Sequence, residues 1–366
     1  MNKGKIIRWG IMGTGFIAHN FAEGLKFVPN SKLVAVGSRT ESQADKFSRC
    51  FGTLCVYSNY EALVSDSNID VIYIATPAAL HREHCLLALE HGKSVLCEKP
   101  FAMNADQAKE IIEVARKKRL FCMEAMWMRF IPLMKKVHTM VKDGAVGEVR
   151  IIKADLGFPY FYDPDDRHFN PSLGGGAMLD LGIYPLSLAT WLLGSPTSIN
   201  SEATLAESGV DEQSAAILNY SNGAKAIISA NLRCQSSNEA YIIGLEGYIR
   251  IQAPLYRPHK MTYVRVPQPR KKSSPEYTPG ILSRIKNFPL LQKSLLRIDG
   301  LLGPIIKATE KSTVISFNGN GYNYEAEEVA DCLLSSQTES TVMPLEETIN
   351  ILGFLDQMRD RWGNRA

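Results

Sequence analysis

Residues 10–18 read GIMGTGFIA, and this stretch decides the fold. It ends a β-branched run, KIIRWGIM at 5–12, and opens a segment whose apolar residues recur at helical spacing. Gly13, Gly15 and Ala18 give a GxGxxA pattern at a strand-to-helix turn. Such glycines let the backbone approach a pyrophosphate, and the helix N-terminus supplies free amides and a positive dipole. The pattern predicts a dinucleotide site, with an ordinary glycine-rich turn as the alternative.

Further β-branched runs alternate with helical patterns over the first 125 residues, namely KLVAVGSR (32–39), DVIYIAT (70–76), KSVLCEK (93–99) and LFCMEA (120–125). This alternation is typical of βαβ units in a parallel sheet. Longer strand-like runs fill residues 149–266, with a Ser-Asn-Gly turn at 221–223. The predicted fold class is α/β, with a Rossmann-type doubly wound parallel sheet followed by an α+β domain that has a large, mostly antiparallel open sheet.

Three parts follow along the chain. We expect an N-terminal NAD(P)-binding domain over residues 1–126, a substrate-binding and oligomerisation domain over 127–343, and a C-terminal helix over 344–366 that packs back on the N-terminal domain. Two amphipathic helices close the chain, the second entered through Pro344. Residues 267–307 are rich in Pro, Lys and Arg and form a basic insertion. A solvated excursion is preferred there over a lid, a subunit contact or a membrane-surface helix.

Composition narrows the class of partner. The 366 residues carry 41 basic and 38 acidic side chains, a net charge of +3, which is too weak for a nucleic-acid-binding face. Seven cysteines without a CxxC pair indicate reduced thiols and a cytoplasmic protein. No apolar run suggests a membrane span. We therefore expect a small-molecule partner, no nucleic acid and no membrane span.

The end of the second strand indicates which dinucleotide binds. It reads Gly37-Ser38-Arg39-Thr40, without the acid that usually holds the ribose of NAD, although Glu41 follows closely. Arg39 can pair with a 2′-phosphate and stack on adenine, so NADP is preferred over NAD; a solvated loop charge is the alternative. The expected cofactor contacts are Gly13, Gly15, Phe16, Ile17, Ser38, Arg39, Thr40, Thr76, Pro77, His81, Glu98 and Lys99.

Two further motifs hold side chains suited to chemistry. Glu98-Lys99-Pro100 follows a buried-looking strand at the carboxyl edge of the parallel sheet, where a cofactor crevice would open. GGGAMLDLGIYPL at 174–186 carries Asp180 and Tyr184 at i and i+4, so one helix face can present both. We expect its glycines to let the chain pass close to the nicotinamide. His168 has no second ligand at metal spacing, so no metal is expected.

With TPAALH (76–81), CEKPFAMN (97–104), MEAMWMRFIP (123–132) and GYNYEAEEVADCL (321–333), these motifs resemble the glucose-fructose oxidoreductase, inositol dehydrogenase and rhizopine-catabolism family (Gfo/Idh/MocA). The branch with dimeric dihydrodiol dehydrogenase and NADP-dependent xylose dehydrogenases is the nearest. The resemblance implies that Lys99 hydrogen-bonds the reacting oxygen and that Tyr184 replaces a histidine as the acid/base group. It also implies that the open sheet pairs subunits into a homodimer or homotetramer.

The expected reaction is reversible hydride transfer between a nicotinamide cofactor and a sugar, polyol or cyclic diol. Lys99 should lower the pKa of the Tyr184 phenol from its usual ~10. Asp180 would orient the substrate or the lysine, or else serve only as a carboxylate at a helix N-terminus. A nucleotide-binding sensor without turnover is the alternative. The expected substrate contacts are Lys99, Trp127, Arg129, Phe158, Arg167, Asn170, Asp180 and Tyr184.

Overall fold

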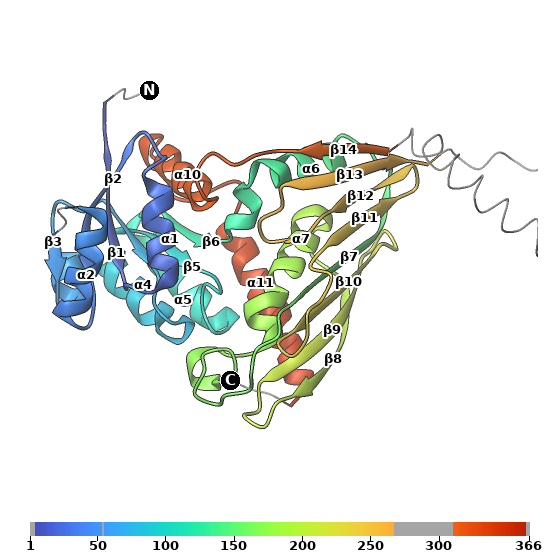
Figure 1. The fold of residues 1–366 in the computed structure, drawn as a ribbon, viewed down its shortest axis with the longest axis horizontal. Coiled ribbons are helices and arrows are strands. Elements are labelled where there is room, and N and C mark those ends of the chain that lie inside the picture. The colour runs from blue at the N-terminus through green and yellow to red at the C-terminus, as the bar shows by residue number, and fades with distance from the viewer. Residues whose placement is uncertain (1–3, 53–54, 267–309, 364–366) are drawn as a thin grey trace, which may run out of the picture.

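The computed structural model describes residues 4–52, 55–266 and 310–363. Two sheets dominate this part of the chain, with helices between them (Figure 1). The blue and cyan N-terminal part holds one sheet, and the green, yellow, orange and red strands form the other. The basic insertion expected at 267–307 lies outside the described residues.

The first sheet has the order β3-β2-β1-β4-β5-β6, and every strand pair in it is parallel. This order matches the Rossmann arrangement and confirms the fold class predicted for this half. The three-residue strand β3 was not predicted because it is too short to show a periodic pattern. The strands are β1 (Ile7–Met12), β2 (Ser31–Gly37), β3 (Cys55–Tyr57), β4 (Val71–Ile74), β5 (Ser94–Glu98) and β6 (Cys122–Ala125).

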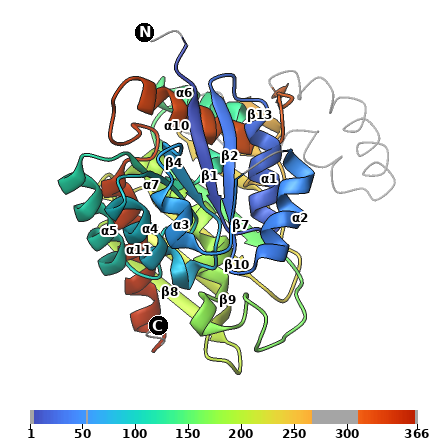
Figure 2. The same ribbon diagram turned by 90° about the vertical axis from the view of Figure 1, so that its left-hand side faces the viewer.

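Helices cover this parallel sheet, as βαβ connections require (Figure 2). Its central strands are therefore buried on both faces, and they read as continuous apolar runs. The helical segments are α1 (Phe16–Leu25), α2 (Glu41–Phe51), α3 (Tyr60–Ser65), η1 (Ala78–Leu80), α4 (His81–Glu90), α5 (Ala105–Lys118), η2 (Trp127–Phe130) and α6 (Pro132–Lys142).

The second sheet has the order β14-β13-β12-β11-β7-β10-β9-β8 and is mostly antiparallel, as predicted. One neighbouring pair, β7 and β10, runs parallel. The predicted turn at 221–223 joins β9 to β10, and Gly223 has φ of 80° there. The strands are β7 (Val149–Gly157), β8 (Ser198–Leu205), β9 (Asp211–Asn219), β10 (Lys225–Asn231), β11 (Ala240–Gly244), β12 (Gly247–Ile251), β13 (Lys260–Arg265) and β14 (Glu310–Val314).

An apolar helix lies between the two sheets. A 3-10 turn, η3 (Pro171–Leu173), precedes a π-helical turn, η4 (Met178–Gly182), which leads into α7 (Ile183–Leu193). Among the described residues, Pro171–Leu193 is long and apolar enough to cross a membrane by length and composition alone, which was not foreseen from the sequence. Its most apolar window is 83% buried inside the protein, as in a core helix that is apolar all round.

The last two helices return to the N-terminal part. α10 (Tyr322–Leu334) packs on α1 and η2, and α11 (Leu345–Arg361) packs on α5, α7 and β8. A Cβ on Gly24 of α1 would lie 3.0 Å from the backbone N of Asn323, so α1 and α10 meet at backbone distance. The sequence assigned only residues 344–366 to this role. α10 also takes it because its apolar face, including Ala326, is buried against the N-terminal helices.

Candidate active site

The glycine turn between β1 and α1 forms an open cradle. Gly13 has φ of 106°, and a Cβ on it would lie 2.8 Å from the carbonyl oxygen of Ala75, so only glycine fits there. A Cβ on Gly15 would meet nothing within 4 Å. Gly15 is also the N-cap of α1 and makes no side-chain capping bond, so the first-turn amides have no side chain on them. This cradle fits a dinucleotide phosphate.

The expected adenosine contacts lie beyond the ends of β2 and β4. Ser38 is buried, with its Oγ 3.5 Å from Thr14 Oγ1, whereas Arg39 and Thr40 are exposed. Phe16 is 79% exposed at the start of α1, and Ile17 is half-buried. Thr76 and Pro77 follow β4 beside the same cradle. Arg39 lies two residues beyond the end of β2.

Lys99 directly follows β5 and reaches across to the helix between the sheets. Its Nζ lies 2.8 Å from Asp180 Oδ1 and 2.8 Å from the Asp180 carbonyl oxygen. The Lys99-Pro100 peptide is cis. Arg167 Nη1 is 3.5 Å from the same Asp180 oxygen. The structure thus joins the two motifs that the sequence presented separately.

Tyr184 begins α7 next to this ion pair. Trp127 Nε1 donates to the Tyr184 hydroxyl at 2.9 Å, and Lys99 Nζ lies 5.0 Å from the centre of the tyrosine ring. Asp180 belongs to the π-helical turn and Tyr184 to the α-helix that follows, so the two do not lie on one regular α-helix. Lys99 nevertheless contacts both side chains.

The pKa values of Tyr184, Asp180 and Lys99 are all shifted, and that of Tyr184 is higher than the sequence led us to expect. Burial raises the pKa of Tyr184 to about 12, although Lys99 and the Trp127 hydrogen bond both lower it. Lys99 thus acts on this pKa in the predicted direction, but burial, which the prediction did not weigh, outweighs it and leaves the pKa above its usual value. Burial would also raise the pKa of Asp180, but Lys99 and Arg167 outweigh it and hold that pKa below the usual range. The pKa of Lys99 is raised because Asp180 and Tyr184 outweigh its burial.

Several expected site residues have structural bonds. Arg129 donates its hydrogen bonds to residues on and near α7. Its Nε donates to Ser187 Oγ at 2.8 Å, and its Nη2 lies 2.7 Å from Glu347 Oε1. This side chain is fully buried, and each of its guanidinium nitrogens has a protein partner, so none is left to bind a substrate. Asn170 Oδ1 accepts from the backbone and hydroxyl of Ser172, so it caps η3.

Two further expected site residues, His81 and Phe158, are held by contacts within the protein. His81 is buried, with Nδ1 2.8 Å from the Pro100 carbonyl and Nε2 2.8 Å from the Thr76 carbonyl. It therefore ties the cofactor-side loop to the Lys99 loop instead of projecting into open space. Phe158 is half-buried, and its ring centre lies 6.2 Å from that of Tyr256. Tyr256 in turn lies 5.9 Å from the Tyr184 ring and was not foreseen.

The glycines at 174–176 serve the protein itself. A Cβ on Gly175 would lie 2.8 Å from the His168 carbonyl oxygen. Gly176 has φ of 127°, and its Cβ would lie 2.6 Å from Asp211 Oδ1. The expected approach to the nicotinamide is therefore not what requires these two glycines. They let the loop fold onto itself and onto the carboxylate that binds the Met178 amide at 2.8 Å.

Two carboxyl groups are buried behind Lys99: Glu98, which the sequence assigned to the cofactor, and Glu325, which it missed. Glu98 accepts hydrogen bonds from the Tyr73 hydroxyl and from the Lys99 backbone N–H. Burial raises the pKa of Glu98 to about 7. Glu325 of α10 is fully buried without a hydrogen-bond partner among the described residues, and burial followed by repulsion from Glu98 raises its pKa well above the usual value. The repeated acids in EAEE gave no sign that this one is buried.

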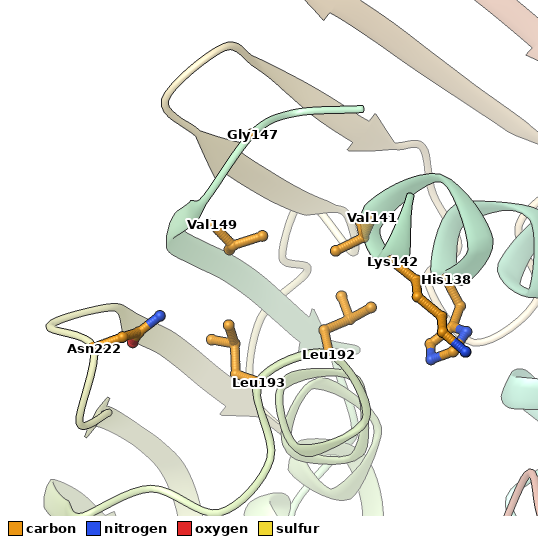
Figure 3. Close-up of a pocket in the computed structure, with 8 residues that line it drawn as sticks. All are labelled: His138, Val141, Lys142, Gly147, Val149, Leu192, Leu193 and Asn222. Carbon is orange, nitrogen blue, oxygen red and sulfur yellow. The ribbon is translucent and has the colours of Figure 1, made fainter. Parts of the chain in front are cut away.

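A cavity of about 290 Å³ lies at the other end of α7, as Figure 3 shows. Leu192 on this helix lies eight residues beyond Tyr184, about 12 Å along the helix axis. The cavity is therefore separate from the Lys99 cluster. Its lining residues are His138, Val141, Lys142, Gly147, Val149, Leu192, Leu193 and Asn222.

Comparisons with known proteins agree with this geometry. Residues 7–126 match the model of the oxidoreductase family with an NAD-binding Rossmann fold, and residues 134–250 match the GFO/IDH/MocA C-terminal domain. The chain therefore belongs to the Gfo/Idh/MocA oxidoreductase family. It is an NAD(P)-dependent oxidoreductase.

Relatives extend the match over nearly the full length. Trans-1,2-dihydrobenzene-1,2-diol dehydrogenase from Xenopus laevis is 34% identical, over 97% of this chain and 98% of the relative. The human enzyme of the same name is 30% identical, over 98% of this chain and 97% of the relative. Among solved structures, aldose-aldose oxidoreductase from Caulobacter crescentus has a TM-score of 0.80 at 21% identity, covering 97% of both chains. A 3-ketoreductase from Actinomadura kijaniata with NADP and TDP-benzene has a TM-score of 0.78 at 22% identity, covering 97% and 98%. The two structures support the fold.

Proposed function

We propose that this enzyme transfers a hydride between NADP and one hydroxyl-bearing carbon of a vicinal diol or sugar. One observation carries the proposal: Lys99 of the nucleotide-binding half meets Asp180 and Tyr184 of the other half at hydrogen-bond and ring-contact distances. The dihydrodiol dehydrogenases that match nearly the whole chain support the diol class. The exposed Arg39, with no acid at the tip of β2, supports NADP.

The protein residues divide the proton work. A bound nicotinamide dinucleotide supplies the hydride acceptor or donor. Tyr184 accepts the substrate hydroxyl proton during oxidation and returns one during reduction. The Lys99 ammonium stabilises negative charge on the reacting oxygen, while Asp180 fixes the position of that ammonium. Trp127 donates to the Tyr184 oxygen and so stabilises its phenolate.

The substrate and the role of Tyr184 can be tested together. We expect NADP reduction with some member of a panel of vicinal diols, aldoses and inositols, and slower reduction of NAD. Tyr184→Phe should lower turnover about 10³-fold while NADPH binding stays near the wild-type value. Tyr220→Phe is the matched control because Tyr220 is equally buried, 6% exposed, and lies outside the site. Cofactor binding without turnover on any substrate would instead favour a sensor.

The cofactor preference has its own test. Arg39→Ala should weaken NADP binding by about tenfold or more and NAD binding much less, because the 2′-phosphate contact is lost from NADP only, whereas stacking on adenine is lost from both. Equal losses for both dinucleotides would contradict this role of Arg39.

We also infer a homodimer or homotetramer formed through the outer face of the eight-stranded sheet. None of the described helices covers that face (Figure 1), and it exposes Ile217 and Ile227, which pair across β9 and β10 at 42% and 40% exposure. Ile227→Asp should shift the mass measured by light scattering toward the monomer. The free cysteines, including exposed Cys50 and Cys234, support a cytoplasmic location.

A further inference from the structure

His168 is a buried imidazole with one unused nitrogen beside the site. The residue is 8% exposed, and its ring stacks on Tyr160 with the centres 4.0 Å apart. Its Nδ1 lies 2.5 Å from Asp166 Oδ1, and its backbone N–H donates to the same oxygen at 2.9 Å. Its Nε2 is buried and has no hydrogen-bond partner among the described residues. An unpaired buried nitrogen is unfavourable, so its position calls for a reason.

The unused nitrogen faces the Lys99 cluster. His168 Nε2 lies 3.9 Å from Asp180 Oδ2, about 1 Å beyond hydrogen-bond length. Asp180 Oδ1 is held by Lys99 at 2.8 Å. A row of titratable groups therefore runs from Lys99 through Asp180 and His168 to Asp166.

The row leads from a buried centre to solvent. The side chains of Lys99 and Asp180 are 14% and 12% exposed, and Tyr184 is 6% exposed. The Asp166 side chain is 43% exposed. The charged and titratable groups that face His168 are Asp166 and Arg167 on its own loop, Asp180 on η4, Tyr160 after β7, and Lys99 beyond Asp180.

The reaction requires such a route. When an alcohol is oxidised to a carbonyl, the carbon–hydrogen bond gives a hydride to the nicotinamide and the hydroxyl gives one proton. That proton must leave the protein, and reduction must bring one in. Imidazole suits this task because it can accept a proton at one nitrogen while releasing one from the other near neutral pH.

We propose that His168 carries the substrate-derived proton between the Lys99–Asp180 pair and solvent, with Asp166 as its outer partner. This inference rests on the proposed oxidoreductase function. A small ring movement that brings Nε2 to Asp180 completes the row. In one concerted transfer, Tyr184 gives the substrate proton to Lys99 while Lys99 gives one to Asp180, Asp180 gives one to Nε2, and the Nδ1 proton leaves to Asp166 and solvent, so Lys99 stays cationic. Asp180 remains ionised between transfers because Lys99 stays paired with it.

The variants separate proton transfer from packing. His168→Ala removes the ring and leaves room for free imidazole. His168→Phe keeps a ring that can stack on Tyr160 but cannot carry a proton. Asp166→Asn keeps an acceptor for Nδ1–H but removes the outer carboxylate. His138→Ala is the matched control, because His138 also stacks on an aromatic ring, Trp191, at 4.4 Å, but lies at the separate cavity.

Diol or sugar oxidation is measured with NADP in weakly buffered solution, with and without added imidazole. The His168→Ala and His168→Phe rates should each fall about 10²-fold. Imidazole should restore His168→Ala in a saturable way and leave His168→Phe unchanged. The Asp166→Asn rate should rise with buffer concentration, while the wild-type and His138→Ala rates should not.

Two results would overturn this role. Wild-type rates in both His168 variants would show that the proton takes another route. A loss that neither imidazole nor buffer relieves, with NADPH affinity also reduced, would show that His168 only supports the loop. A wild-type protein inactive on every substrate would overturn the proposed function, and this inference with it.

Discussion

Two charged clusters lie against the same central helix, and their bonding differs. At its start, Lys99 pairs with Asp180. Further along it, Arg129 binds Ser187 through the hydroxyl and the backbone carbonyl, both at 2.8 Å, and pairs with Glu347 at 2.7 Å. Both clusters are buried cations matched by carboxylates, and both join distant parts of the chain.

The difference lies in what is left unbonded. Each guanidinium nitrogen of Arg129 has a protein partner, and its side chain is 0% exposed. Near Lys99, His168 Nε2 has no hydrogen-bond partner among the described residues, and the Arg167 side chain is 63% exposed. A saturated cluster stabilises the fold, whereas a cluster with open positions can receive a substrate or pass a proton. Substitutions in each cluster should therefore affect different measurements.

Lys99→Met should have the largest effect. Turnover should fall about 10³-fold, or ~4 kcal/mol in transition-state stabilisation, because no cation then faces the reacting oxygen. The measurement is kcat with NADP and the best diol or sugar substrate, together with NADPH affinity, which should change little.

Lys93→Met is the matched control for that change. Lys93 is also buried, and its Nζ likewise donates to two acceptors, the carbonyls of Asp66 and Ile69, but it lies outside the Lys99 cluster. The variant should lose stability and keep its turnover per folded molecule. Equal kinetic losses in the Lys93 and Lys99 variants would break the distinction between the two types of cluster.

Arg129→Met should show the opposite profile. Removing the cation leaves the partly buried Glu347 carboxylate unpaired, which costs about 3 kcal/mol of folding free energy. Turnover per folded molecule should stay within about twofold of wild type. Urea unfolding followed by fluorescence, with kcat measured below the transition, checks both. A variant that is stable but inactive would show that Arg129 acts at the substrate site, as the sequence predicted.

The sequence could predict where the motifs lie, but not which of their polar side chains have hydrogen-bond partners in the folded protein. The glycine turn, Lys99 and Tyr184 lie in local patterns whose geometry depends on a strand end or a helix start, so they could be predicted. No local pattern marks Arg129, whose partner Glu347 lies 218 residues away in sequence. His168 has its partners Asp166, Tyr160 and Asp180 nearby in sequence, but no periodic pattern predicts that they meet. Arg129 meets Glu347 only after folding, and the π-helical turn that displaces Asp180 from a regular helix has no signal in single-residue preferences.

Glu124 is a buried carboxyl group with protein partners on both oxygens, and it should make the folding stability depend on pH. Its two oxygens accept from the Phe101 amide and the Thr348 hydroxyl, and burial raises its pKa to about 7. A carboxyl group with a raised pKa in the folded state stabilises the protein at low pH, and this stabilisation is lost as pH rises through about 7. Glu124→Gln should remove about 2 kcal/mol of the stability loss between pH 5 and 8.

Unfolding midpoints of the wild type and Glu124→Gln at pH 5, 6, 7 and 8 measure this. The wild-type curve should fall more steeply, and the two curves should differ most at pH 8. Glu98 and Asp211, whose pKa values burial raises to about 7 and about 6, act with the same sign and remain in both proteins. Parallel curves would mean that Glu124 is already ionised in the folded protein at pH 5.

The smallest expected effects come from two glycines of the turn between β1 and α1. A methyl group added at Gly13 meets protein atoms, whereas one added at Gly15 does not. Gly13→Ala places a methyl group 2.8 Å from the Ala75 carbonyl at a positive φ, so it should cost about 2 kcal/mol of stability. Gly15→Ala meets nothing in the protein within 4 Å and should cost no more than about 1 kcal/mol, because alanine is a poorer N-cap than glycine. Its methyl group would instead occupy the space that a pyrophosphate needs, so NADP affinity should fall about tenfold. Calorimetric titration compares the two variants at a temperature where both are folded. Unchanged NADP affinity in Gly15→Ala would mean that the cofactor phosphates do not approach this amide.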